Sequence, residues 1–251
     1  MALIRPFRAI RPRPELAARI AAVPYDVVDT AEARELARGN PHSFLHVSRA
    51  EIDLPPDTPP YADEVYTRAW ETFEAFRSSW LVQDTAPHVY VYRLTTGDHT
   101  QTGVAATFAV QEYLDGHIRK HETTRKQKED DRTRHITELR AQTGPVLLTY
   151  AQTSAVDEIV GRVSASSPLY DVAADDGVTH TVWKAEAADA AALVSAFGEV
   201  PTLYIADGHH RAASAVRAWQ ALGGGPDEDA AFFLAVAFPD TQMRILPYHR
   251  V

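Results

Sequence analysis

The stretch that decides the fold runs from residue 201 to residue 238. It reads PTLYIA (201–206), DG (207–208), HHRAASAVRAWQAL (209–222), a glycine-rich loop, and AFFLAVAF (231–238). The first and last segments are short apolar runs typical of buried strands, and the middle segment has the length and composition of a helix. Strand, tight turn, helix and strand in this order predict a sheet covered by helices.

Outward from this unit, further strand and helix signals alternate along the chain. A helix is expected over 61–80, where Val65, Ala69, Phe73, Phe76 and Trp80 recur at helical spacing. We expect a hairpin of 88–95 and 102–110 around the turn at Gly97. The other expected elements are strands at 24–29, 146–150, 168–173, 178–184 and 243–248, and helices at 155–165, at 186–197 and from a Thr30 cap to Arg38. The predicted fold class is therefore α/β (α+β), a mixed sheet with flanking helices.

The composition excludes several function classes. The 251 residues carry a net charge of −9 and contain no cysteine, which removes thiol nucleophiles, cysteine zinc sites and iron–sulfur clusters. The N-terminus MALIRPFRAI has no apolar leader segment, and no run approaches the length of a membrane span. We therefore expect a cytoplasmic protein without a membrane partner, and the acidic charge disfavours a nucleic-acid partner.

The polar turn between the strand and the helix concentrates functional groups. Gly208 permits close backbone approach, and the free N–H groups at a helix N-terminus suit an anion. His210 and Arg211 could hold a phosphate, while Asp207 could hold Mg²⁺ or accept a proton beside His209. The alternative is an ordinary Asp-Gly turn that caps a helix.

A second segment, residues 117–140, runs against the acidic trend with a net charge of +3. If it forms a helix that starts near Thr123 or Thr124, its cations could close over a polyphosphate; these are Arg125, Lys126, Lys128 and Arg132. The alternative is a solvated charged helix. Glu122, flanked by cations that keep it ionised, is the candidate general base.

Two other carboxylate and histidine patterns carry less weight. His121 and Glu122 begin a zincin-like pattern, but Arg125 stands where the second histidine ligand belongs, so zinc protease chemistry is disfavoured. Asp26 in PYDVVD could lie at a strand end, with a turn-forming role equally possible.

Several motifs together resemble one family. They are MALIRPFRAIRP at the start, PYDVV (24–28), HETT (121–124), KEDDR (128–132), GPVLLTY (144–150), DGHHR (207–211) and ILPYHRV at the end. The chain is similar to the DUF1015 family, which is placed in the ParB/sulfiredoxin-like superfamily and related to free-serine kinases. The resemblance implies one ParB/sulfiredoxin-like unit over 1–251, with about 42–195 as an inserted α+β subdomain and the phosphate-binding core at 196–251.

The resemblance also implies an activity. It suggests a nucleotide-dependent phosphotransferase in which Asp207, Gly208, His209, His210 and Arg211 hold the phosphates of ATP or ADP with Mg²⁺. A glutamate would activate the hydroxyl of free L-serine or a similar small metabolite, with Glu122 as the first candidate and Glu15 as the fallback. The alternative is a nucleotide-binding regulator or nucleotide hydrolase of the same superfamily without kinase activity.

Overall fold

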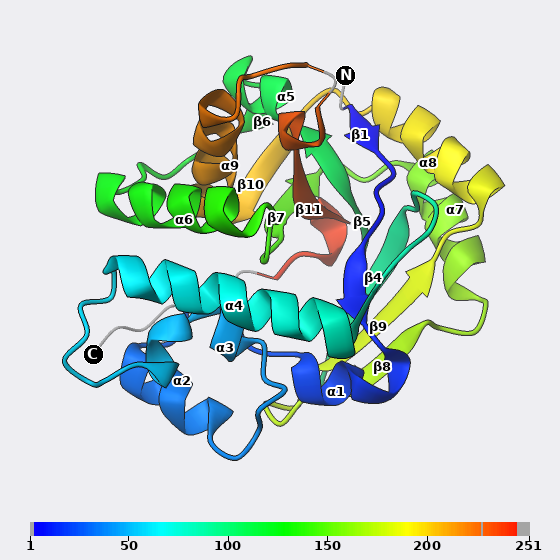
Figure 1. Ribbon diagram of the computed structural model, residues 1–251. Coiled ribbons are helices and arrows are strands. Elements are labelled where there is room, and N and C mark those ends of the chain that lie inside the picture. The colour runs from blue at the N-terminus through cyan, green and yellow to red at the C-terminus, as the bar shows by residue number, and fades with distance from the viewer. Residues whose placement is uncertain (1–2, 227, 245–251) are drawn as a thin grey trace.

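The described part of the chain, residues 3–226 and 228–244 of a computed structural model, is built around one large mixed sheet (Figure 1). Within these residues its main path runs β6-β10-β7-β11-β5-β4-β9-β8. The strand bounds are β6 Ile118–Arg119, β10 Leu203–Asp207, β7 Val146–Tyr150, β11 Phe232–Pro239, β5 His99–Ala109, β4 Tyr90–Thr96, β9 Thr179–Lys184 and β8 Tyr170–Ala173. The pairs β6–β10 and β7–β11 are parallel and the other neighbours antiparallel, which confirms the predicted mixed sheet.

Two short N-terminal strands lie outside the main path of the large sheet. Strand β1 (Ile4–Arg5) pairs with β5, and β2 (Ile10–Pro12) pairs with β3 (Leu81–Gln83) in a separate two-stranded sheet. Strand β7 lies between β10 and β11, so the ranges 42–195 and 196–251 both contribute strands to the large sheet. The subdomain division and the ParB-like core stay predictions from the resemblance.

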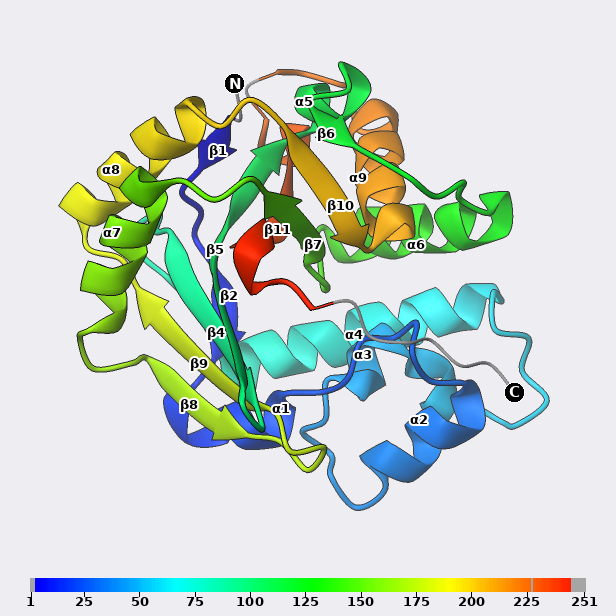
Figure 2. The same ribbon diagram turned by 180° about the vertical axis from the view of Figure 1, so that it is seen from behind.

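Helices cover both faces of the sheet because successive side chains of a strand point to opposite faces. Phe108 of β5 contacts Phe197 of α8 (Ala187–Gly198), whereas the adjacent Ala109 clusters with Trp219 of α9 (His209–Ala221). Figure 2 shows α7 (Ser154–Ser164) beside α8, along β4 and β9. This alternation places α9 on the face opposite α8, with its N-terminus at the end of β10.

A helical lobe, residues 14–79, packs beside the sheet. It contains α1 (Ala17–Ile20), α2 (Thr30–Ala37), α3 (Leu45–Ser48) and α4 (Asp63–Ser79). The short helix α5 (Val110–Leu114) lies apart from the lobe, near β6. The apolar stripe predicted for 61–80 is confirmed, since Val65, Ala69, Phe73 and Phe76 are buried. Leu139 of α6 (Lys126–Leu139) joins the same apolar cluster, so α6 connects the lobe to the sheet.

Most predicted elements are confirmed, including the hairpin at Gly97, but two differ and one is not tested. Residues 24–29 form a turn, in which the Val27 amide donates to the Pro24 carbonyl at 3.3 Å, and not a strand. Asp29, not Thr30, caps α2, because its carboxylate accepts from the Glu32 amide at 2.9 Å and completes a capping box. The expected strand at 243–248 lies almost wholly outside the described residues.

No helix in the described ranges has both the length and the apolar character that a bilayer span needs.

Candidate functional site

The turn after β10 has the predicted strand-to-helix geometry. Gly208 lies in the left-handed region, with a φ of 88°, where a side chain is strained, and a Cβ there would also meet the Arg211 guanidinium at 3.3 Å. Helix α9 then runs for 13 residues, and its first turn contains no acidic residue. The amides at its N-terminus therefore carry the positive end of the helix dipole without an internal counter-charge.

The two histidines of the turn hold the segment that precedes α6. His209 Nε2 accepts a long hydrogen bond from the His121 amide at 3.4 Å, and His210 Nε2 accepts from the Arg125 amide at 3.0 Å. Burial lowers the pKa of both rings, assisted by His121 at His209 and by Lys128 at His210. Both rings are therefore neutral, with their proton on Nδ1, and they anchor residues 121–125.

Two exposed carboxylates lie around this helix end. Glu122 places Oε2 at 3.6 Å from His209 Nδ1, and its side chain is 58% exposed. The side chain of Asp207 is 64% exposed. Both groups can reach a ligand from solvent, which is the requirement for a general base or a cation ligand.

Arg211 points into the protein, where both of its terminal nitrogens are engaged. Its guanidinium donates to Asp26 at 2.9 Å, to Asp207 at 3.0 Å and to the Pro145 carbonyl at 2.5 Å. Only 11% of its side chain is exposed. The arginine therefore joins the 24–26 turn to the end of β10, and it orients Asp207.

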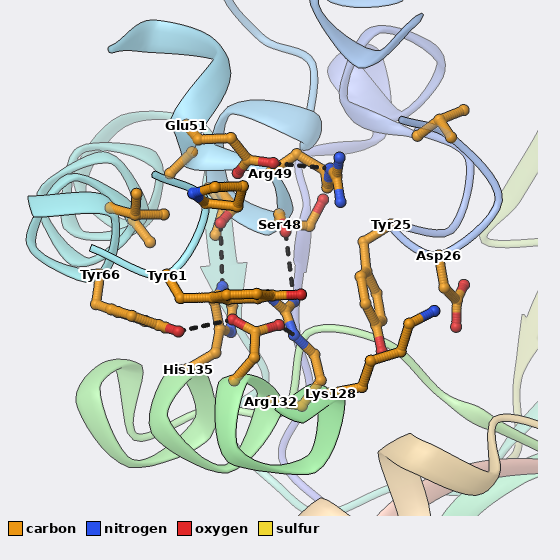
Figure 3. A pocket seen from close by; sticks show the side chains of 17 residues that line it. Tyr25, Asp26, Ser48, Arg49, Glu51, Tyr61, Tyr66, Lys128, Arg132 and His135 are labelled. Carbon is orange, nitrogen blue, oxygen red and sulfur yellow. Dashed lines mark hydrogen bonds and ion pairs between the residues drawn. The ribbon is translucent and has the colours of Figure 1, made fainter. Parts of the chain in front are cut away.

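The four cations expected to close over a polyphosphate occupy different environments. Lys126 pairs with Asp130 at 2.7 Å and is 84% exposed, and the Arg125 side chain is also exposed. Arg132 is buried, bonded to Asp131 at 2.7 Å and stacked on the Tyr25 ring at 4.1 Å. Lys128 lines a cavity and points toward Asp26 (Figure 3). These side chains therefore do not converge on a single point.

That cavity lies between the helical lobe and α6 and was not anticipated as a whole. It has a volume of about 130 Å³, and six charged residues line it: Asp26, Arg49, Glu51, Lys128, Asp131 and Arg132. We call these six residues and their cavity the charged cleft. Three tyrosines, one histidine and one serine complete the polar lining: Tyr25, Tyr61, Tyr66, His135 and Ser48.

The neutral polar groups of the charged cleft are held uncharged by burial. Burial raises the pKa of Tyr25 to about 12. Burial, and then the Arg132 cation, lowers the pKa of His135 to about 3, and its Nε2–H donates to the Val47 carbonyl at 3.1 Å. Of the eleven polar residues around the cavity, the sequence motifs had singled out Asp26, Lys128 and Arg132. The signals for two others were the PYDVV and KEDDR motifs, which contain Tyr25 and Asp131.

The structure also bears on the metal and base alternatives. His117 and His121 flank strand β6 and do not share a helix. Within residues 3–226 and 228–244, no three histidine, aspartate or glutamate side chains are grouped to hold a metal ion. Glu15, the fallback base, lies close enough to Tyr170 of β8 to influence its pKa, at the opposite sheet edge from β10. Of the two candidate bases, Glu122 is therefore the one that lies beside the turn.

Comparison with known proteins gives one match. Residues 4–251 match the family model described as "Protein of unknown function (DUF1015)". A search of the curated proteins and a search of the solved structures each found no match. Because the family model covers nearly the whole sequence, the chain belongs to the DUF1015 family.

Proposed function

We propose that the protein is a nucleotide-dependent phosphotransferase that moves a phosphoryl group from ATP or ADP to a small hydroxylated metabolite, with free L-serine as the first acceptor to test. The observation that carries the proposal is that two exposed carboxylates, Glu122 and Asp207, lie at the N-terminus of α9, whose own first turn has no acidic residue. A phosphate donor needs an anion-binding end, and phosphoryl transfer needs a base and a metal-binding carboxylate beside it.

In this proposal the chain's own groups divide the work. The α9 amides and Gly208 receive the phosphates, with the exposed Arg125 and Lys128 supplying positive charge nearby. Glu122 accepts the proton of the attacking hydroxyl, and the neutral His209 ring lies beside it, with Nδ1 at 3.6 Å from Glu122 Oε2. Arg211 holds Asp207 in place from the protein side.

Magnesium fits the donor set in one way. Asp207 Oδ2 is engaged by Arg211, which leaves its other oxygen and the Glu122 carboxylate as exposed hard ligands. Mg²⁺ commonly uses one or two carboxylates together with substrate phosphates. When bound with the nucleotide, it would neutralise charge on the transferred phosphoryl group. A cytoplasmic location is part of the proposal, because the nucleotide and free amino acids are available there.

A second candidate, a nucleotide-binding regulator or nucleotide hydrolase, is favoured by the state of Arg211. Its guanidinium already has three protein acceptors, so it does not reach outward to stabilise a transferring phosphoryl group. A regulator needs the anion-binding end alone, and a hydrolase needs water in place of the acceptor.

The deciding experiment incubates the full chain with Mg²⁺, L-serine and either ATP or ADP, and measures phosphoserine, released phosphate and nucleotide by mass spectrometry. Phosphoserine supports the phosphotransferase, phosphate release without phosphoserine supports the hydrolase, and binding without product supports the regulator. A thermal-shift series with ATP, ADP and CTP measures binding, because a ligand of the native state raises stability in proportion to the logarithm of its concentration. No shift with any nucleotide contradicts all three readings.

A further inference from the structure

We infer that the charged cleft binds a small zwitterionic metabolite of amino-acid size. The inference rests on the proposed function only for the role of that ligand as the phosphoryl acceptor. Binding itself follows from the burial, the charges and the size of the cleft, and requires no nucleotide.

The first step is the burial of its charges. The side chain of Glu51 is 8% exposed, that of Asp131 is 11% exposed and that of Arg132 is 12% exposed. Replacing buried ion pairs by apolar side chains of similar volume is often neutral or stabilising, so stability alone gives little reason to gather them around a cavity. Their concentration around open space indicates recognition of a ligand.

The second step is the charge pattern. Glu51 pairs with Arg49 at 3.0 Å, Asp131 pairs with Arg132 at 2.7 Å, and Asp26 pairs with Arg211 at 2.9 Å. Arg211 also pairs with Asp207 at 3.0 Å, so these four carboxylates and the four cations Arg49, Lys128, Arg132 and Arg211 sum to zero. A ligand with a net charge would leave a buried charge unbalanced, whereas a zwitterion adds one charge of each sign.

The third step is the orientation of the ligand. Lys128 has no ion-pair partner among residues 3–226 and 228–244, and its ammonium points toward the Asp26 side of the cleft (Figure 3). A ligand carboxylate can pair with Lys128, and a ligand ammonium can pair with the neighbouring Asp26, whose side chain is 24% exposed. The two ends of a small amino acid thus find opposite charges in one cavity.

The fourth step is size. A buried water needs roughly 10–15 Å³ of such volume, so about 130 Å³ is room for roughly ten waters, which a metabolite of amino-acid size can occupy. The rings of Tyr25 and Tyr61 border the space beside Arg49 (Figure 3). Glycine, alanine and serine therefore fit the cleft.

The cleft is also adjacent to the turn. Asp26 lines the cleft and bonds Arg211, and the charges of Lys128, Glu122 and Asp26 all influence the pKa of His210. A hydroxylated ligand in the cleft would therefore lie next to the helix end that the proposed function assigns to phosphate.

The test is isothermal titration calorimetry of the full chain without nucleotide, with glycine, L-alanine and L-serine as probes. L-serine methyl ester, which lacks the carboxylate charge, and D-glycerate, which lacks the ammonium, test the zwitterion requirement. We expect at least one of the three small amino acids to bind, and neither of the two altered probes to bind. The inference is overturned if no small amino acid gives a heat of binding, or if the ester and glycerate bind as tightly as the small amino acids.

Two variants locate the site. Lys128→Gln should raise the dissociation constant for the small amino acid about tenfold, because a charged partner of the carboxylate is lost. Lys120→Gln is the matched control: this lysine is exposed and lies over the Tyr113 ring, away from the cleft, so affinity should stay within about twofold. Equal affinity in both variants overturns the proposed site.

The inference and the proposed function fail separately. Amino-acid binding that Lys128→Gln weakens, without phosphoserine formation, contradicts the phosphotransferase and supports the cleft. Phosphoserine formation with an L-serine KM that is unchanged in Lys128→Gln supports the phosphotransferase and overturns the cleft as its acceptor site.

Discussion

The turn at 207–211 and the charged cleft both combine cations with carboxylates, but they hold them in different states. At the turn, Glu122 and Asp207 are mostly exposed, whereas Glu51 and Asp131 in the cleft are about nine-tenths buried. An exposed carboxylate can exchange protons and ligands with little reorganisation, and a buried one is fixed by its partner. The difference is consistent with the proposal that the turn carries out the chemistry and the cleft binds the ligand.

The largest effect should follow removal of the charge on Glu122. Glu122→Gln keeps the shape of the side chain but cannot accept a proton, so we expect the phosphoryl-transfer rate at saturating nucleotide and serine to fall by roughly 10²–10⁴-fold. Nucleotide affinity, measured by calorimetry, should stay unchanged. Glu158→Gln on the exposed side of α7 is the matched control. A wild-type rate in Glu122→Gln would remove Glu122 as the base.

The next effect concerns stability and contrasts a buried arginine with an exposed one. Arg211→Met removes the partner of Asp26 and leaves this carboxylate, 24% exposed, without its cation, so unfolding free energy should fall by roughly 3 kcal/mol in urea titrations. Arg162→Met breaks an exposed pair with Asp189 and should cost less than about 1 kcal/mol. Equal losses in the two variants would show that Arg211 does not hold the turn.

A pH experiment sharpens the role of the neutral histidines. The pKa values of His135, His209 and His210 are lowered in the folded state, that of His135 to about 3, so the unfolded chain binds more protons just below pH 6.5. The contribution of these neutral histidines to the free energy of unfolding should therefore be complete above pH 6.5 and should decrease as the pH falls below that value. For His135 the decrease should continue toward pH 3, and each titrating histidine contributes a slope of up to about 1.4 kcal/mol per pH unit.

Urea unfolding of the wild type and of His135→Gln between pH 7 and pH 4.5 measures this slope. The glutamine can still donate to the Val47 carbonyl but does not titrate, so the slope should decrease by about one proton. An unchanged slope would mean that His135 titrates normally.

The smallest predicted effect is local to the turn. His210→Ala removes the acceptor of the Arg125 amide and should cost about 1 kcal/mol, the usual net value of one hydrogen bond. Hydrogen exchange at Arg125 should accelerate several-fold, while exchange in the central strand β5 should accelerate only by the global loss. Equal acceleration at both places would show that His210 does not anchor residues 121–125.

Much of the fold was predictable from local patterns. The apolar stripe of 61–80, the hairpin around Gly97 and the unit from Leu203 to Pro239 follow from periodicity and turn chemistry, which depend on neighbours in sequence. Residues 24–29 were predicted wrongly as a strand, because Val27 and Val28 suggest extended structure while the turn is held by Arg211, 185 positions away.

The candidate site divides in the same way. Sequence alone determined that Asp207, Gly208 and His209 lie together at a strand-to-helix turn, because consecutive residues need no tertiary contact to be neighbours. Only the tertiary structure decided that Arg211 faces inward to Asp26, and that Arg49, Glu51 and Lys128 border one cavity. These placements depend on how the helical lobe packs against α6, and such long-range packing is set by the burial of apolar surface over the whole chain rather than by any local sequence signal.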